Sequence, residues 1–196
     1  MAVTQTRDRG RRRRRPEEAE EEILQSAREL FAKRPWHEVT VGEIMERTTL
    51  SRKSFYVYFR DRYELLARML APLREQGDAV MAQRDVRETL LGIARIYQAN
   101  GELLRALAEA ARWDPEAEGV WRGFTEGPIQ RIAGQIRAGI ENGSIAPLDP
   151  DATARRMVGM NLFAFFDELA GRPDADVEAV VDSLNAIWRR ALYLRP

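Results

Sequence analysis

The sequence predicts an all-α protein with an N-terminal three-helix helix-turn-helix domain and a C-terminal helical domain, about nine helices in all. Helical periodicity runs along the chain, and no alternating strand pattern of useful length interrupts it. Residues 40–59 have the pattern of two short helices joined by a tight turn. We therefore expect a disordered Arg-rich arm over residues 1–16, the helix-turn-helix domain over 17–68 and the second helical domain over 69–196.

Composition narrows the class of protein before any motif is considered. With 196 residues, 44% of them hydrophobic, the chain is long enough to bury a sizeable core. It has no cysteine, which excludes disulfides, thiolate metal sites and cysteine nucleophiles. The polar N-terminus does not resemble a signal peptide, and no apolar run approaches the ~18 residues of a membrane span. We expect a cytoplasmic protein with no membrane partner, no cofactor and no metal site.

The first two helices have clear start signals. Pro16 suits the first turn of a helix, and the acidic residues that follow it lie where the helix dipole favours them. Pro35 ends this helix. Thr40 with Glu43 three residues later is a capping-box pattern, which opens a short helix to Arg47.

The third helix follows a turn at residues 48–50, with Ser51 as its cap and an end near Tyr58. Asp61 then caps a longer helix that Pro72 is expected to bend or weaken. The remaining helices are expected over about residues 86–112, 116–142 with a kink at Gly127-Pro128, 150–170 and 174–194.

The third helix carries cations and hydroxyls where a helix made only for a core would carry apolar residues. Arg52 and Lys53 lie in its first turn, and either can pair with guanine, although the planar fork of Arg52 suits that contact better. Ser54 suits a base or a phosphate, and the hydroxyls of Tyr56 and Tyr58 have the reach for phosphates. The alternative for Tyr56 and Tyr58 is core packing, and the alternative for Arg52 and Lys53 is that both are solvated surface charges. The pattern predicts a helix that binds DNA in the major groove.

The charge distribution agrees with a DNA-binding end. Residues 1–16 hold seven arginines against one aspartate, a charge of +6, and residues 47–68 hold six bases against two acids, or +4. Residues 69–196 hold fifteen bases and nineteen acids, or −4. Such a distribution is typical of a basic DNA-binding end attached to an acidic body. The Arg-rich run is either a solvated tail or an arm that touches the DNA backbone or minor groove.

Residues 20–68 resemble the N-terminal domain of the TetR family of transcriptional regulators. The resemblance rests on the Leu30-Phe31 pair, on the string TVGEI from Thr40, on SRKSFYVYF from Ser51 and on RYELL from Arg62. The family usually has glycine in the turn where this chain has Thr49, and a positive φ there would strain a side chain. The resemblance implies phosphate contacts for Tyr56 and Arg62. The expected DNA-contacting residues are Thr40, Ser51, Arg52, Lys53, Ser54, Tyr56, Tyr58, Arg62, Arg11, Arg12 and Arg13.

The second half of the chain contains the strings EAARW from Glu109, VWRGF from Val120 and IENGSIAPLDPDATARRMVGMNLFAFF from Ile140. Through these strings, residues 105–192 are similar to the ligand-binding half of those TetR regulators that include the mycobacterial ethionamide-resistance repressors. This resemblance implies a homodimer built by the last two helices and a cavity among the middle helices for a small apolar effector. The expected ligand-binding residues are Trp113, Trp121, Phe124, Met157, Met160, Asn161, Phe163 and Phe166. Each of these has ordinary core packing as its alternative, and the Asn161 amide has two open partners: a ligand, or a hydrogen bond to a neighbouring helix.

The last helix carries more apolar surface than packing on its own domain requires. The expected dimer residues are Val180, Val181, Leu184, Ile187 and Trp188. Two DNA-binding domains on a two-fold axis predict a palindromic operator with half-sites ~34–36 Å, or a multiple of that, apart.

The sequence therefore predicts a DNA-binding regulator, a repressor that a small apolar ligand releases from its operator. Two alternatives stay open: a DNA-binding regulator or architectural protein without an effector, and an enzyme with a basic tail. The enzyme is the weaker alternative because His37 is the only histidine, lies in a loop and has no serine or carboxylate pair arranged around it.

Overall fold

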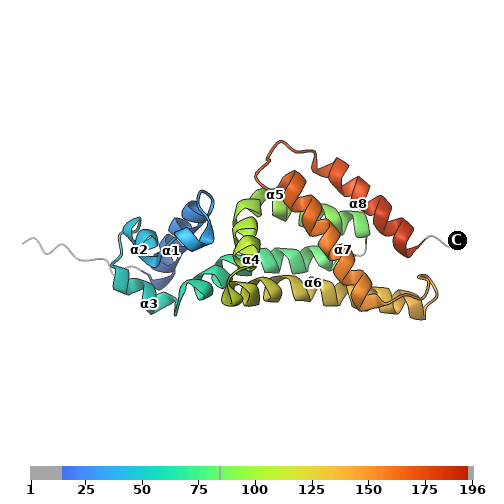
Figure 1. The fold of residues 1–196 in the computed structure, drawn as a ribbon, viewed down its shortest axis with the longest axis horizontal. Helices are drawn as coiled ribbons and strands as arrows, with labels where there is room; N and C mark the ends of the chain where they lie inside the picture. Colours follow the sequence, from blue (N-terminus) through green and yellow to red (C-terminus); the bar gives the residue numbers. More distant parts are fainter. Residues whose placement is uncertain (1–14, 84, 194–196) are drawn as a thin grey trace, which may run out of the picture.

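The computed structural model describes residues 15–83 and 85–193, and this part of the chain is all α-helical (Figure 1), as predicted. The eight α-helices are α1 (Pro16–Phe31), α2 (Val41–Glu46), α3 (Phe55–Tyr58), α4 (Arg62–Met81), α5 (Val86–Ala110), α6 (Pro115–Glu141), α7 (Pro150–Ala164) and α8 (Val177–Leu192). The count is one below the nine predicted, although α5 is broken by a kink into two helical segments. The predicted contacts of Arg11, Arg12 and Arg13 lie outside the described residues.

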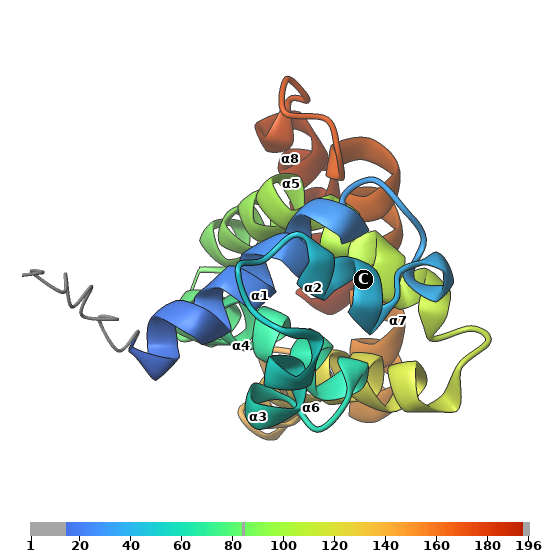
Figure 2. The same cartoon turned by 90° about the vertical axis from the view of Figure 1, so that its left-hand side faces the viewer.

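The N-terminal helices α1, α2 and α3 gather at one end of the molecule, which faces the viewer in Figure 2. Their core contains Ile23, Ile44 and Phe55, each at most 1% exposed. Trp36 closes the side of this core, 5.1 Å from the Phe31 ring and therefore in stacking distance. Helix α1 ends at Phe31, earlier than the predicted stop at Pro35.

The larger C-terminal part is built from α4 to α8 (Figure 1). Helix α6 packs against α4 and α7, while α5 packs against α4 and α8. Pro72 lies inside α4 and Pro128 inside α6, and both helices continue through their prolines without a break. Because α4 begins beside the N-terminal helices and ends in the C-terminal part, it joins the two along one continuous rod.

The break in the long fifth helix was not predicted. Asn100 has φ −126° and ψ 15°, and its side-chain amide donates to the Ile96 carbonyl over 3.0 Å. The next residue, Gly101, packs directly on Ala170, which follows a π-helical turn at Phe165–Leu169. A Cβ atom on Gly101 would lie 2.3 Å from the Ala170 Cβ, so only glycine fits this approach. The second half of α5, yellow-green in Figure 1, therefore turns away from the first.

Candidate nucleic-acid interface and internal cavity

The start of α2 is fixed by the predicted capping box. Thr40 Oγ1 accepts from the Glu43 backbone N–H over 3.2 Å, and Glu43 Oε2 accepts from the Thr40 N–H over 2.9 Å. The other Glu43 oxygen accepts from Arg34 Nη1 of the α1–α2 connection at 2.6 Å. Hydrogen bonding from Arg34 first, and from Thr40 second, lowers the pKa of Glu43 from 4.5 to about 2. The capping box is confirmed.

This lowered pKa predicts an acid dependence of folding. The free energy of unfolding that Glu43 contributes is complete above pH 4.5, the ordinary value, and is lost as the pH falls through about 2. Urea unfolding of wild type and Glu43→Gln at several pH values between 5 and 2 measures this. Glutamine keeps a side-chain acceptor for Thr40 but loses the charge. We expect the stability difference between the two proteins to shrink as the pH falls; a constant difference would contradict the assignment.

The turn between the two short helices is held by α1. The Thr49 N–H donates to Glu22 Oε1 over 2.6 Å, and Thr48 Oγ1 donates to the Met45 carbonyl over 2.8 Å. Among the described residues only two glycines have positive φ, so Thr49 adopts an ordinary backbone conformation. The strain that a threonine would suffer at a position reserved for glycine does not arise here.

The third helix begins as a 3-10 turn at Arg52–Ser54 and continues as α3. Ser51 does not cap it through a backbone N–H as predicted; its hydroxyl shares a 2.9 Å hydrogen bond with the Ser54 hydroxyl. Residues 52–54 form 3-10 rather than α geometry, and the Ser51 hydroxyl is paired with Ser54 instead of a backbone N–H. Phe55 and Phe59, one helical turn apart, are 0% and 1% exposed and anchor the helix to the core.

The opposite side of this helix faces outward. Arg52, Lys53 and Tyr56 are exposed, while Ser54 and Tyr58 are half-buried. Neither Arg52 nor Lys53 makes an ion pair with another residue of the described chain. Val57, at 77% exposure, was not among the residues predicted to contact DNA. Arg52, Lys53 and Tyr56 are thus brought together on one short helix, which lies at the end of the molecule shown in Figure 2.

Arg62 has partners at the junction between the two parts of the molecule. Its guanidinium carbon lies 4.6 Å from the centre of the Trp36 ring, and its Nη2 is 3.9 Å from Asp114 Oδ2. Tyr63 donates its hydroxyl to the same Asp114 oxygen over 2.7 Å. Asp114 is also the N-cap of α6, since its other oxygen accepts from the Glu116 N–H. This junction ties the first turn of α4 to the first turn of α6.

A cavity of about 220 Å³ lies within the C-terminal helices and is mostly apolar. Helices α4, α5, α6, α7 and α8 all contribute to its wall, including the side chains of Leu73, Met81, Leu90, Ile93, Ile96, Tyr97, Phe124, Ile132, Val158, Asn161, Leu162, Phe165 and Trp188. Two polar links between α4 and α6 lie at its edge: Arg74 donates to the Gly123 carbonyl over 2.6 Å, and Arg131 pairs with Asp78 at 2.9 Å.

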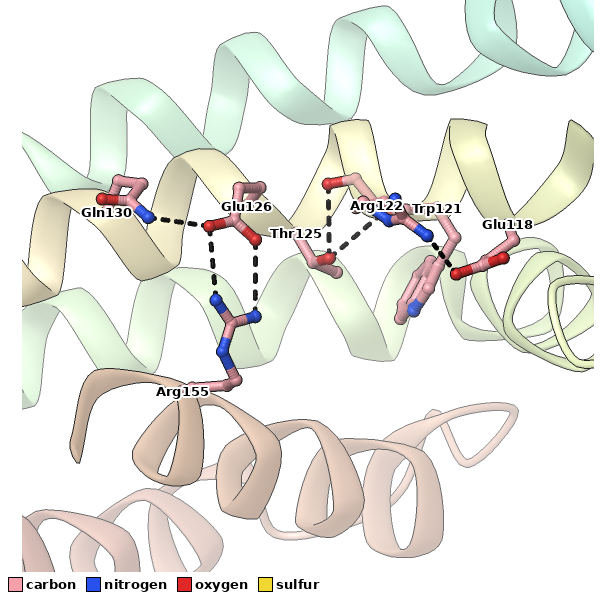
Figure 3. A network of polar contacts seen from close by, with 7 residues as sticks. All are labelled: Glu118, Trp121, Arg122, Thr125, Glu126, Gln130 and Arg155. Atoms are coloured by element: carbon pink, nitrogen blue, oxygen red, sulfur yellow. Dashed lines mark hydrogen bonds and ion pairs between the residues drawn. The ribbon is translucent and has the colours of Figure 1, made fainter. Parts of the chain in front are cut away.

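The outer surface of α6 is joined to α7 by charged residues. Figure 3 shows Glu126 accepting from Gln130 of its own helix and from Arg155 of α7. Glu118 and Arg122 form a further ion pair on the same helix. These exposed contacts lie on the face of α6 turned to solvent, and each contributes little by itself.

The cavity wall includes only part of the predicted ligand set. Phe124 and Asn161 line the cavity, whereas Trp121, Met157, Met160 and Phe166 pack around it without forming its wall. Two members are wrong: Trp113 is 88% exposed and Phe163 is 74% exposed. Trp113 precedes the N-cap of α6 in a surface loop, and Phe163 lies on the side of α7 away from the cavity.

Phe165 takes the place in the cavity wall that Phe163 and Phe166 were predicted to fill. Val158, Asn161 and Phe165 are spaced by three and four residues, the helical spacing of a single face. That spacing was available in the sequence and identifies the phenylalanine that lines the cavity.

Two polar side chains in the cavity wall retain hydrogen-bonding capacity. Trp188 Nε1 donates to Asn161 Oδ1 over 3.1 Å, so the Asn161 amide has the neighbouring-helix partner that the sequence left open. The amide nitrogen of Asn161 donates to no residue of the described chain. Burial raises the pKa of the Tyr97 phenol, and its hydroxyl has no hydrogen-bond partner among the described residues.

The residues predicted for the dimer are mostly buried within the protomer. Val180, Val181, Leu184 and Trp188 are at most 9% exposed, so a direct dimer contact for these four is a wrong prediction. They form the face of α8 that packs on its own domain, chiefly on α5. Ile187, at 46% exposure, is the member of the set that reaches the surface.

No helix in the described part of the chain is both long and apolar enough to cross a membrane. Across residues 15–83 and 85–193, no group of three or more histidine and carboxylate side chains is arranged to hold a metal ion.

A short outward-facing cationic helix, held beyond a tight turn and joined to a helical domain with an internal cavity, defines a helix-turn-helix transcriptional regulator. Residues 23–69 match the family model "Bacterial regulatory proteins, tetR family", and residues 86–194 match "Transcriptional regulator EthR, C-terminal domain". The chain belongs to the TetR family of DNA-binding transcriptional regulators, with a C-terminal domain of the EthR type.

Individual relatives agree with the family over nearly the whole chain. The HTH-type transcriptional regulator EthR of Mycolicibacterium smegmatis is 27% identical, covering 97% of this chain and 95% of the relative. EthR of Mycobacterium tuberculosis is 29% identical, covering 94% and 93%. The crystal structure of FadR from Bacillus subtilis in complex with stearoyl-CoA has a TM-score of 0.72 at 16% identity, covering 88% of this chain and 98% of that chain. This structural likeness shows a shared fold.

Proposed function

We propose that this regulator is a repressor that binds a palindromic operator as a homodimer and leaves it when a small apolar ligand fills the cavity. The main support for DNA binding is the outward side of the third helix. Phe55 and Phe59 hold its inner side in the core, while Arg52, Lys53 and Tyr56 face solvent together. Side chains held this way can enter a major groove without rearrangement of the helix.

The proposed DNA contacts are of two kinds: contacts with bases, which determine sequence specificity, and contacts with the backbone, which position the protein on the duplex. Arg52 is assigned to a guanine edge, with Lys53 as the other cation of the first turn. The phosphate contacts are assigned to Thr40, Ser51, Ser54, Tyr56, Tyr58 and the arm residues Arg11, Arg12 and Arg13. Arg62, whose Nη2 lies 3.9 Å from Asp114 Oδ2, is assigned to the flanking backbone.

The ligand assignment rests on the cavity and on the relatives. A volume of about 220 Å³ lies below the ~300–1,000 Å³ of typical drug-sized pockets, which favours a small ligand. The wall is mostly apolar. The Asn161 amide nitrogen and the Tyr97 hydroxyl still have unused hydrogen-bonding capacity, which favours a ligand with one polar group. The FadR structure in complex with stearoyl-CoA is an example of this fold binding a ligand with a long apolar chain.

Two connections join the cavity to the DNA-binding end. The first half of α5 lines the cavity, and its second half, beyond the kink at Asn100, contacts α1 and the 3-10 turn at Trp36–Glu38. The Tyr63–Asp114 hydrogen bond joins α4 to α6, and α6 also lines the cavity. A ligand that favours one arrangement of α5 and α6 therefore shifts the population of DNA-binding orientations.

The dimer is assigned to the exposed sides of α7 and α8. Phe163 of α7 and Ile187 of α8 are large apolar residues open to solvent, and they lie on the two helices that the family resemblance assigns to a four-helix bundle. A two-fold axis through this surface places the same residues of both protomers in contact. The domain boundary at residues 68 and 69 falls inside α4, so the proposed DNA-binding and ligand-binding domains share that helix. We place the protein in the cytoplasm, where its operator lies.

Replacing Phe163 by glutamate is expected to split the dimer. A two-fold interface sets the new carboxylates of both protomers in an apolar contact, which adds repulsion and a desolvation penalty. Light scattering after size exclusion measures the mass. Trp113→Glu is the matched control because Trp113 is equally open to solvent but lies in the α5–α6 loop. We expect a monomer for the first variant and a dimer for the second; a dimer in both would refute this interface.

The function is tested with DNA from upstream of the protein's own gene in mobility-shift titrations at a stated salt concentration. We expect specific duplex to bind far more tightly than random duplex of equal length, and equal binding of both would reject sequence-specific regulation. Mass spectrometry of the purified protein identifies a retained ligand, which is then added to the complex. Release of the duplex by that ligand supports ligand control; unchanged binding at saturating ligand rejects it.

A further inference from the structure

An exposed valine on the DNA-binding helix has no role in the proposed function so far. Val57 is 77% exposed, more than the neighbouring Tyr56 at 59%. It makes no contact that would explain a β-branched apolar residue in a helix of four residues, where valine is a poor helix former. A single exposed valine is ordinary on most surfaces, but this one lies on the helix proposed to enter the major groove.

The buried residues fix the direction in which Val57 points. Phe55 and Phe59 are four residues apart and lie on the inner side of the helix. Lys53 and Val57 are also four residues apart, and both are exposed. Val57 therefore shares the outward side with the cations assigned to the DNA.

The chemistry of valine selects what it can contact in a major groove. Its side chain neither donates nor accepts hydrogen bonds, so it recognises neither a phosphate nor the polar edge of a base. The C5-methyl group of thymine is the apolar feature that base pairs present in the major groove. A β-branched side chain also loses little rotamer freedom on contact because its χ1 angle is already restricted.

We infer that Val57 contacts the C5-methyl group of a thymine in each operator half-site and contributes to sequence specificity there. This inference rests on the proposed DNA-binding function. It adds a base preference that neither Arg52 nor the phosphate contacts can supply.

The test combines a methyl deletion in the protein with a methyl deletion in the DNA. The full-length protein first selects its preferred duplex from a random library, and each thymine of that duplex is then replaced in turn by deoxyuridine. This replacement removes the methyl group and keeps every hydrogen-bonding group of the base. Binding of each duplex is measured for wild type, for Val57→Ala and for the isosteric Val57→Thr.

We expect one thymine per half-site at which deoxyuridine weakens wild-type binding by about fourfold, the effect of one buried methyl group. The same replacement should have no effect on Val57→Ala, and Val57→Thr, which keeps one methyl group, should fall between. Random duplex should bind all three proteins equally.

Three results would overturn the inference: a selected half-site without thymine, no thymine sensitive to deoxyuridine, or a sensitivity that persists unchanged in Val57→Ala. In each of these the selected duplex still binds better than random duplex, so the proposed function stands. If selection enriches no sequence at all, the proposed function fails and this inference fails with it.

Discussion

Replacing Arg52 by alanine is expected to weaken operator binding by the dimer from about 30-fold to more than 10,000-fold. A bidentate arginine–guanine pair contributes ~1–3 kcal/mol of discrimination, and a dimer on a palindrome loses two such pairs. The side chain is exposed and makes no ion pair with another described residue, so its removal leaves the fold intact. Titrations against the operator and against single-base variants of it measure both the affinity and the preference at one position.

The neighbouring residues give a contrast within the same helix. Tyr56→Phe removes a phosphate contact and should weaken operator and random duplex to a similar extent. Lys53→Ala removes the other cation assigned to the base edges and should weaken binding to the operator more than binding to random duplex. Arg189→Ala is the matched control because it removes an exposed arginine in the last turn of α8, at the opposite end of the molecule (Figure 1). Unweakened specific binding by the Arg52→Ala/Tyr56→Phe double variant would reject the assignment of this helix.

Replacing Gly101 by alanine is expected to destabilise the fold by about 1–3 kcal/mol, the usual effect of overpacking, or more if the backbone must move. The new Cβ would lie 2.3 Å from the Ala170 Cβ and 2.4 Å from its Cα, a backbone atom that cannot rotate away. The increase in helix propensity from glycine to alanine, ~1 kcal/mol, offsets only part of this.

Gly134→Ala is the matched control for that substitution. Gly134 also lies inside a long helix, but a Cβ there would meet no atom within 4 Å. This variant should therefore gain up to ~1 kcal/mol from helix propensity alone. Urea unfolding at one fixed protein concentration measures both variants, because the proposed dimerisation makes stability depend on concentration. Equal stabilities of the two variants would refute the close packing of α5 on Ala170.

The sequence predicts the helices well because their start signals are local. Thr40 with Glu43 and Asp61 with its two following N–H groups are short patterns that need no distant partner, and both form as predicted. The break at Asn100 was missed for the opposite reason. An asparagine inside a periodic apolar pattern does not indicate a kink, and what requires it is the approach of Ala170, which is distant in sequence.

The same distinction between local signals and distant contacts explains which candidate site residues the sequence indicated. Arg52, Lys53 and Tyr56 were found because the composition of the helix differs from that of a core helix. Val57 was not predicted as a DNA contact because an apolar residue type alone does not indicate whether the side chain is buried or exposed. Trp113 and Phe163 were misplaced since large aromatic residues are usually buried, and in this chain a loop exposes one and the outer side of α7 exposes the other.

The cavity wall has a consequence for how this regulator can diversify. Every wall residue in the described chain lies at or after Leu73, whereas the outward residues of the third helix end at Tyr58. In the proposed function, mutations that change which molecule is sensed therefore fall on positions separate from those that choose the operator. Lineages can exchange one signal for another while still governing the same genes, and the same separation lets an engineer alter the signal of a sensor without redesigning its promoter.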